Sequence, residues 1–131
     1  MARELAQEPT EAHWRSASGR AYYALLIELR DAMTNWGLSR PLPSQVHQLV
    51  YRRLFVPTDP DMKQIGIWFD RLRTARVRAD YETWALAEFG TDAGAKWAVQ
   101  RADDALKLLD AIEADPPRRD AIAAEIKAVL P

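Results

Sequence analysis

The chain has 131 residues, of which 48% are hydrophobic and 28% are charged, and its formal net charge at pH 7 is −1. This length fits one domain with one hydrophobic core, and this composition argues against a disordered chain. The sequence contains no cysteine, which excludes disulfide bonds, thiolate zinc sites and a cysteine nucleophile. Its two histidines, His13 and His47, leave little for a histidine metal cage or a catalytic triad. We therefore expect no bound metal and no cofactor.

The sequence gives no sign of a membrane segment. No apolar run approaches the ~20 residues that span a bilayer. The first eleven residues carry Glu4, Glu8 and Glu11 and lack the apolar block of a signal peptide. We expect a cytoplasmic protein that does not contact the membrane.

The small net charge conceals an uneven distribution along the chain. Residues 40–78 contain eight basic and three acidic residues, whereas residues 79–131 contain six basic and eleven acidic ones. The basic middle could bind a phosphate ligand, could pair with the acidic C-terminal part, or could simply form a solvated helix face. The chain also has 14 arginines against 4 lysines, and arginine is preferred where the geometry of phosphate binding matters.

The first predicted helix covers about residues 11–36. Thr10 is its candidate N-cap, and Gly37 is its expected stop before the Pro41–Pro43 break. Apolar residues recur at steps of three and four along it, which indicates one buried face. This stripe consists of Tyr22, Leu26, Leu29, Met33 and Trp36, widened by Ala21, Leu25 and Ala32.

Four further helices are predicted, over about residues 43–55, 60–79, 92–114 and 118–129. Residues 80–91 have no helical period and indicate a loop, while the Asp115–Pro117 segment is expected to end the fourth helix. The residues expected to be buried in these helices are Val46, Leu49, Val50, Leu54; Ile65, Trp68, Leu72, Ala75; Ala95, Ala98, Ala102, Ala105, Leu109, Ile112; and Ile122, Ile126, Val129. The elements predict a single all-α domain over residues 1–131. We expect a four- to five-helix up-and-down bundle of two long antiparallel pairs, with its core at about 11–113 and an extra C-terminal helix at 118–129.

Four arginines lie within eight residues at the end of the third predicted helix: Arg71, Arg73, Arg76 and Arg78. The helix dipole favours cations at this end by ~0.3–1 kcal/mol each, which is the simplest explanation. On a helical wheel, however, Arg73, Arg76 and Asp80 share one stripe. Asp80 could therefore pair with Arg76 and leave Arg73 to bind phosphate oxygens.

A second cluster lies in the first helix. Arg20 and Tyr23 share one side of the helix, and Tyr22 belongs to the apolar stripe. A buried tyrosine hydroxyl needs a hydrogen-bond partner, and Asp80 is a plausible acceptor for Tyr22. Tyr23 could pack in the core or contact a ligand, and Gly19 is compatible with the close approach of another helix.

Two weaker candidates concern side chains that bind metals in other proteins. His47 lies between Val46 and Leu49 in the second helix, which favours a partly buried structural histidine over a ligand. Asp59 and Asp61 lack further ligands nearby in the sequence, so we predict no metal site there.

These residues carry a family resemblance. The segment GRAYYA at 19–24, His47, and the segment LRTARVRADY at 72–81 resemble the HEPN domains of bacteria and archaea, in the branch with an RAYYA start and an ADY ending. The similarity covers about residues 14–113, and the two motifs are fairly specific together but weak apart. The resemblance implies a four- or five-helix bundle that dimerises and joins a polar cleft across its two-fold axis.

The resemblance also implies a candidate active site. Many HEPN domains are metal-independent ribonucleases whose motif is an arginine, a polar residue after it, and a histidine four to six residues after the arginine. Arg73 takes the arginine place, Thr74 the polar place, and Tyr81 the place of a tyrosine that receives an inhibitory nucleotidyl group in some relatives. The histidine place is Ala79, which can neither accept nor donate a proton, so the motif is degenerate. His47 could replace it only within ~3 Å of the same phosphate.

Three functions follow from these observations. The first is a HEPN-like protein of a toxin–antitoxin or defence system that binds RNA, a nucleotide or a partner protein. The second is an active ribonuclease toxin in which Arg73, Asp80 and Tyr81 are catalytic and His47 is auxiliary. The third is an adaptor bundle whose arginines only pair with residues 103–115. The residues expected to bind RNA or a nucleotide are Arg20, Tyr23, Arg73, Arg76, Arg78 and Tyr81.

The expected partners are a second copy of the chain, RNA or a nucleotide, and a minimal nucleotidyltransferase antitoxin. The antitoxin is implied by the resemblance alone. The homodimer is also suggested by the number of tryptophans, because tryptophan is enriched at protein interfaces. These are Trp14, Trp36, Trp68, Trp84 and Trp97.

Overall fold

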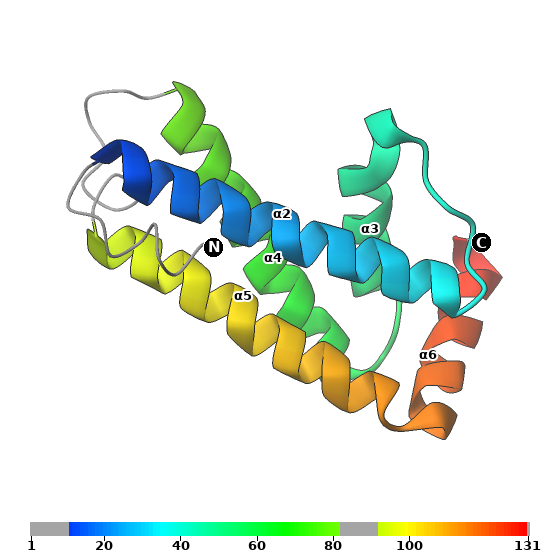
Figure 1. The fold of residues 1–131 in the computed structure, drawn as a ribbon. Coiled ribbons are helices and arrows are strands. Elements are labelled where there is room, and N and C mark those ends of the chain that lie inside the picture. Colours follow the sequence, from blue (N-terminus) through cyan, green and yellow to red (C-terminus); the bar gives the residue numbers. More distant parts are fainter. Residues whose placement is uncertain (1–10, 82–91, 131) are drawn as a thin grey trace.

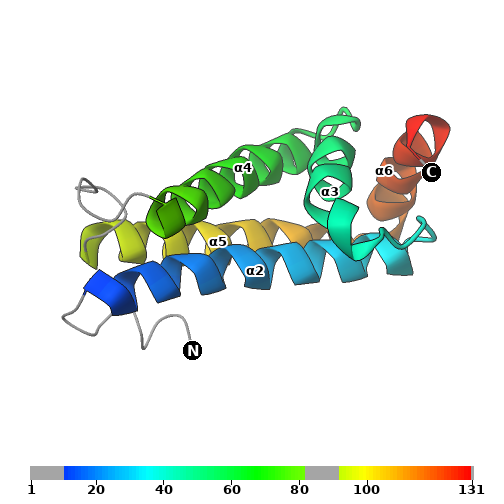
Figure 2. The ribbon, with the colours of Figure 1, turned by 90° about the horizontal axis from the view of Figure 1, so that it is seen from above.

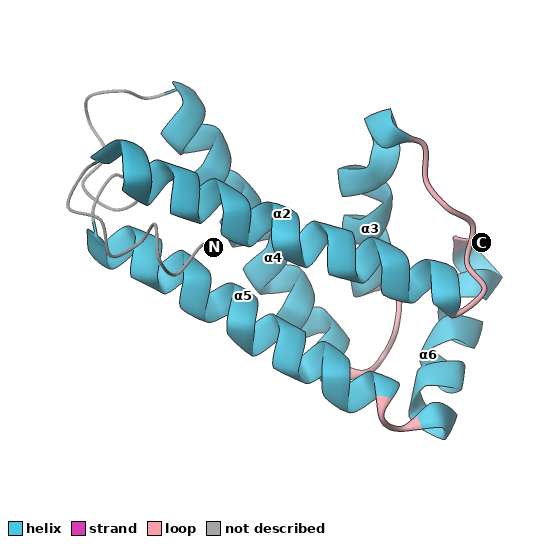
Figure 3. Ribbon diagram, viewed as in Figure 1, coloured by secondary structure: helices cyan, strands magenta, loops and turns pink. Residues whose placement is uncertain are grey.

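The computed structural model describes residues 11–81 and 92–130, and within them the side chains of residues 17–77 and 93–130. In the described part of the chain, helices are joined by short loops and turns, and there are no strands (Figure 3). The predicted all-α bundle is therefore confirmed. The elements are α2 (Glu11–Asn35), the short 3₁₀ helix η1 (Pro43–Gln45), α3 (Val46–Phe55), α4 (Pro60–Tyr81), α5 (Asp92–Glu113) and α6 (Pro116–Val129).

Three long helices form the body of the bundle. α2 and α5 run side by side in the same direction, and α4 packs on both of them in the opposite direction (Figures 1 and 2). The short helices α3 and α6 lie at the end of the body where α2 ends and α4 begins. The prediction of two long antiparallel pairs is thus corrected, because α3 is a ten-residue helix that crosses the body instead of lining it.

α2 ends at a turn that depends on glycine. Gly37 has a φ of +91°, a conformation that side-chain-bearing residues rarely adopt. Its N–H donates to the Thr34 carbonyl at 3.0 Å, and the N–H of Leu38 donates to the Met33 carbonyl at 3.1 Å. These two bonds form a Schellman motif, and both Met33 and Leu38 are buried, as its apolar contact requires. The expected stop at Gly37 is confirmed.

The core contains the predicted stripes of α2 and α5 in full. Four of the six stripe positions in α5 are alanines, whose small side chains let α2 and α5 approach closely. The buried side of α4 differs from the prediction. Met62, Ile65, Phe69 and Leu72 are buried, whereas Trp68 is only partly buried. The core-facing stripe of α4 therefore runs through position 69 and not through position 68.

Arg53 is a buried arginine that the sequence did not lead us to expect. Its exposed fraction is 1%, alongside the apolar residues Val50 and Leu54 of α3. Its Nη2 donates to the carbonyl and to the hydroxyl oxygen of Ser39, both at 3.0 Å. Arg53 therefore holds the segment between α2 and η1 against α3, and that segment borders the site described below.

α6 begins two residues before the predicted start. Pro116 and Pro117 occupy its first turn, where a missing N–H costs nothing, and the Asp115 carboxylate accepts from the backbone N–H of Arg118 at 3.3 Å. The prolines therefore start this helix as well as ending the preceding one. Val129, predicted to be buried, is 63% exposed because it is the last residue of the helix.

Polar contacts fasten α6 to the start of α4. Arg118 donates to both carboxylate oxygens of Asp59, at 2.7 and 2.9 Å, and to Asp61 at 2.7 Å. Glu125 accepts from the N–H and the hydroxyl of Thr58 at 3.1 and 3.3 Å. Asp59 also caps α4 by accepting from the N–H of Asp61 at 2.9 Å. The two aspartates are thus engaged by an arginine and by the helix start.

The three tryptophans with described side chains pack against the core. Trp36 is buried, and Trp68 and Trp97 are partly buried. Trp14 and Trp84 lie outside the described side chains. The described tryptophans therefore give no support to the predicted homodimer.

Candidate functional site

A hydrogen-bonded pair from two helices lies at the centre of the candidate site. Tyr22 is buried in α2, and His47 is half-buried at the start of α3. The Tyr22 hydroxyl oxygen and the His47 Nδ1 are 2.6 Å apart. The buried hydroxyl thus has its partner in His47. The side chain of Asp80, the acceptor suggested by the sequence, lies outside the described residues.

Both members of the pair are neutral at pH 7. Burial, assisted by the positive charge of Arg73 and opposed by Asp70, lowers the pKa of His47 to about 4. Burial raises the pKa of Tyr22 to about 12, although the charges of Arg73 and Arg76 oppose this shift. If the hydroxyl donates the shared hydrogen bond, the imidazole carries its proton on Nε2. If Nδ1–H donates it, Nε2 keeps a free lone pair.

Stacked aromatic rings hold the His47 ring in place. Phe69 of α4 stacks on His47 with ring centroids 4.8 Å apart and on Tyr22 at 5.5 Å. Tyr51 lies one turn after His47 and stacks on it at 6.2 Å, and Phe55 packs on Tyr51 at 5.0 Å. The row joins α2, α4 and α3, so the position of the imidazole depends on how these three helices pack.

Two arginines of α4 border this pair. The Arg76 Cζ lies 4.8 Å from the ring centroid of Tyr23 and 5.9 Å from that of Tyr22. Arg73, one turn earlier, is exposed, and its charge is close enough to lower the pKa of both Tyr22 and His47. Tyr23 is 44% exposed. A guanidinium, an open aromatic ring and a neutral imidazole are therefore brought together from three helices.

The other predicted site residues with described side chains lie around this cluster. Arg20 is exposed on α2, one turn before Tyr23. Arg71 is exposed, but two residues before Arg73 on a helix it projects to a different side. The Thr74 hydroxyl donates to the backbone carbonyl four residues earlier at 3.1 Å, so it is engaged within its own helix.

Arg78, Asp80 and Tyr81 lie in the last turn of α4, but their side chains lie outside the described residues. The same is true of Ala79, the place of the motif histidine. The predicted pairing of Arg76 with Asp80 and the catalytic roles of Asp80 and Tyr81 therefore stay predictions.

The acidic partners proposed for the arginine cluster are not found at Arg71 and Arg73. Among the described side chains, no ion pair joins either arginine to a carboxylate of residues 103–115. Asp104 of that segment pairs instead with Arg101 of its own helix at 2.9 Å. The adaptor hypothesis thus lacks its expected contact at these two positions.

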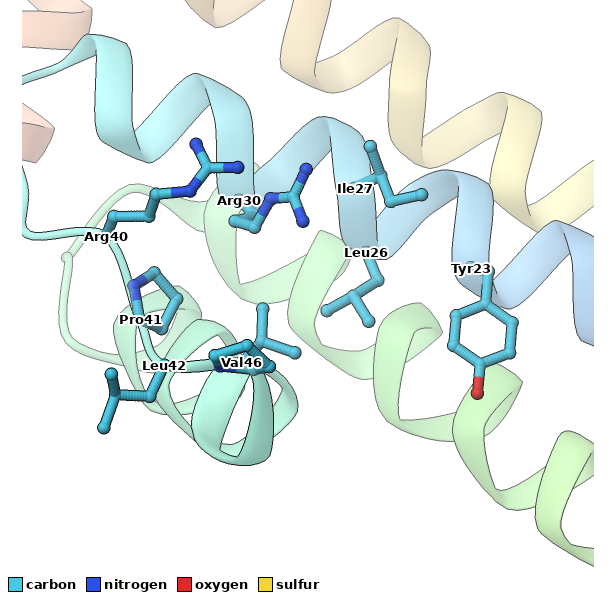
Figure 4. Close-up of a pocket in the computed structure, with 9 residues that line it drawn as sticks. Tyr23, Leu26, Ile27, Arg30, Arg40, Pro41, Leu42 and Val46 are labelled. Atoms are coloured by element: carbon cyan, nitrogen blue, oxygen red, sulfur yellow. The ribbon is translucent and has the colours of Figure 1, made fainter.

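An open pocket of about 570 Å³ lies beside the cluster, between α2 and the segment that leads into α3 (Figure 4). It is lined by Tyr23, Leu26, Ile27, Arg30, Arg40, Pro41, Leu42, Pro43 and Val46. Figure 4 shows the two guanidinium groups along one edge and the Tyr23 ring at the end away from Arg40. The sequence analysis missed this pocket because its lining comes from two segments with no common period. Ile27 and Leu42 are apolar residues outside the predicted stripes, and they could have indicated an apolar surface at this place.

The described residues offer no cluster of three or more histidine or acidic side chains that could hold a metal ion. None of the described helices is both long enough and apolar enough to cross a membrane. The chemistry available from the site's own side chains is positive charge, aromatic stacking and hydrogen bonding by a neutral imidazole.

Comparison of the chain with protein-family models, with curated proteins and with solved structures found no match. The HEPN resemblance therefore stays a prediction.

Proposed function

We propose that this protein binds single-stranded RNA on the surface formed by Arg20, Tyr23, Arg73 and Arg76, as a HEPN-like protein with a degenerate ribonuclease motif. The proposal depends above all on the surroundings of Arg73. It is exposed, lies beside the Tyr22–His47 pair, and forms no ion pair among the described side chains. Such an arginine can bind a phosphate without first breaking an existing pair.

Tyr23 supplies a surface for a base next to this phosphate position. Tyr23 is 44% exposed, and the Arg76 guanidinium lies over its ring. Bases stack on aromatic rings with little dependence on sequence, and each stack contributes ~1–3 kcal/mol. An exposed tyrosine between arginines therefore supports binding of an unpaired strand more than binding of a duplex, whose bases are already stacked.

The proposal is tested by fluorescence anisotropy with a labelled unstructured RNA at several salt concentrations. The Arg73→Ala variant should bind more weakly, and the slope of log affinity against log salt should decrease in magnitude by about 1. The matched control is Arg71→Ala, which removes the same charge from another side of the same helix and should bind nearly as wild type does. Absence of binding, binding that ignores salt, or equal effects of the two substitutions would contradict the proposal.

A metal-independent ribonuclease is the second candidate, and the position of His47 favours it. Ala79 occupies the motif histidine's place, but His47, on a different helix, is near enough to Arg73 for that charge to lower its pKa. An imidazole that donates Nδ1–H to the Tyr22 oxygen keeps a lone pair on Nε2. That lone pair could take the proton of a 2′-hydroxyl as its oxygen attacks the adjacent phosphorus, and the 5′-oxygen leaves with a proton from solvent water.

Incubation of the protein with labelled RNA in the presence of a chelator tests this candidate. Cleavage should leave a 2′,3′-cyclic phosphate and should be lost in both His47→Gln and Arg73→Ala. RNA that stays intact would eliminate the ribonuclease and leave the binding function, and cleavage that survives either substitution would show that His47 and Arg73 do not carry it.

The toxin–antitoxin or defence context, the nucleotidyltransferase partner and the homodimer belong to the same proposal and depend on the HEPN resemblance. Sedimentation at several protein concentrations tests the dimer, and a monomer at all of them would contradict it. A nucleotidyltransferase encoded by the adjacent gene would support the pairing with an antitoxin.

A further inference from the structure

We infer that the pocket between α2 and the segment before α3 binds a base of the same RNA strand whose phosphate is bound by Arg73. This inference rests on the proposed RNA binding and specifies where the strand continues. Its starting point is Tyr23, which lies in the arginine cluster and also lines the pocket. A ligand that contacts the Tyr23 ring is therefore at the entrance of the pocket.

The dimensions and the lining of the pocket suit a base. Its volume of about 570 Å³ lies in the range of small-molecule sites. Its walls are largely apolar, and Ile27 and Leu42 keep 44% and 62% of their surfaces exposed. Large apolar side chains left this open gain free energy when a flat hydrophobic group covers them. A base is such a group, and its edges can still reach solvent because the pocket is open.

Positive charges lie on both sides of the apolar surface, as phosphates lie on both sides of a base in a nucleic acid strand. Arg76 lies over the Tyr23 ring at one end of the pocket, and Arg30 and Arg40 line the part of the pocket that lies away from Tyr23 (Figure 4). Tyr23 and Arg30 are seven residues apart on one helix, a rise of about 10 Å, which is the length of about three stacked nucleotides.

Arg30 and Arg40 together retain a net positive charge. Asp31 lies 3.0 Å from Arg30 and 3.9 Å from Arg40, so one carboxylate is shared between two guanidinium groups. Arg40 is 59% exposed at its side chain. A second phosphate could therefore bind at this end without losing a strong pair.

An acidic peptide could also meet arginines and apolar residues, but the position of Tyr23 favours RNA. The ring has the Arg76 guanidinium over it and lines the same pocket as Arg30 and Arg40. The Arg76 guanidinium, the Tyr23 ring and the apolar pocket are therefore adjacent. This order matches the alternation of phosphate and base along an RNA strand. Peptide binding becomes one of the outcomes that the experiment distinguishes.

The experiment uses neutral substitutions at exposed positions of the full chain, so that folding is preserved and charge is unchanged. Ile27→Ser and Leu42→Ser should each weaken binding of a labelled unstructured RNA about threefold to thirtyfold, because less apolar surface is covered by the base, with the salt slope of the wild type. The matched control is Ile67→Ser on α4, where the isoleucine is 40% exposed against 44% for Ile27 and does not line the pocket. This control should bind as wild type does.

An RNA that lacks its bases at successive positions gives the second readout. This RNA should bind the wild type more weakly than the complete RNA does. Ile27→Ser should not weaken its binding further, because no base is present to enter the pocket. If Ile27→Ser weakens binding equally with and without bases, or if Ile27→Ser behaves as Ile67→Ser does, the pocket does not hold a base. Binding that still requires Arg73 would in that case leave the proposed function intact.

Two further outcomes overturn the inference in distinguishable ways. If the wild type binds no RNA, the proposed function and the base pocket fail together. If Ile27→Ser leaves RNA affinity unchanged but alters the sedimentation coefficient, the pocket is a contact between protein copies and not a base site.

Discussion

The neutral His47 predicts a specific loss of stability in acid. The unfolded chain protonates this histidine near its ordinary pKa of 6.5, whereas the folded protein does so only at about 4. Between these values the unfolded state binds more protons, so the folded state is favoured less as the pH falls. The stabilisation is complete above about pH 6.5 and is lost progressively toward pH 4. Linkage with these two values gives a loss of about 2.5 kcal/mol by about pH 4.5, and solvent access to the half-buried ring lowers the expectation to about 2 kcal/mol.

Urea unfolding of the wild type and of His47→Gln over this pH range measures the effect. Other acidic groups titrate equally in both proteins, so the difference between the two curves isolates His47. The free energy of unfolding of the wild type, minus that of His47→Gln, should fall by about 2 kcal/mol between about pH 8 and about pH 4.5. The ring protons of His47 in NMR spectra should show the same low midpoint, and His47→Gln assigns them because only His13 remains. Parallel curves, or a midpoint near 6.5, would refute the reasoning.

Further substitutions test how the helices are held together, each by urea unfolding. Gly19→Ala should add about 0.5–1 kcal/mol of stability, because a Cβ there would lie an ordinary 3.9 Å from its nearest neighbour. Gly66→Ala should instead cost more than about 1 kcal/mol, since its Cβ would lie 2.7 Å from the Phe55 ring. Arg118→Ala should cost about 1–2 kcal/mol, whereas Arg119→Ala, whose pair is exposed, should stay within about 0.5 kcal/mol. Equal effects within either pair would contradict the assigned contacts.

The sequence predicts most of the helices because their signals are local. The stripe of α2 repeats over four turns, and Gly37 is needed at its end by backbone conformation alone. The start of α6 was wrong by two residues because Pro116 and Pro117 suit both the end of one helix and the first turn of the next. In α4, a choice between adjacent positions 68 and 69 decides which aromatic side chain is buried, and only the neighbouring helices determine that choice.

The candidate site is less predictable because its contacts join distant segments. The chemistry of Arg73 and Tyr23 can be recognised from residue type and helical spacing. The partner of Tyr22 cannot, because its hydrogen bond joins residues 25 positions apart and depends on which side of α3 faces α2. Arg53 shows the same limit: an arginine is normally taken as exposed, and its burial requires the Ser39 oxygens that the preceding turn brings to it.

The parallel arrangement of α2 and α5 has a consequence for the newly made protein. These two helices are neighbours in the bundle, but α3 and α4 lie between them in the chain. On a translating ribosome the apolar stripe of α2 is therefore complete well before the alanine stripe that covers it. At ~5–20 residues per second, the interval is on the order of several seconds. A nascent chain in that interval presents a long apolar helix face, which makes it a natural client for chaperones and sets α5 as the element whose emergence ends the exposure.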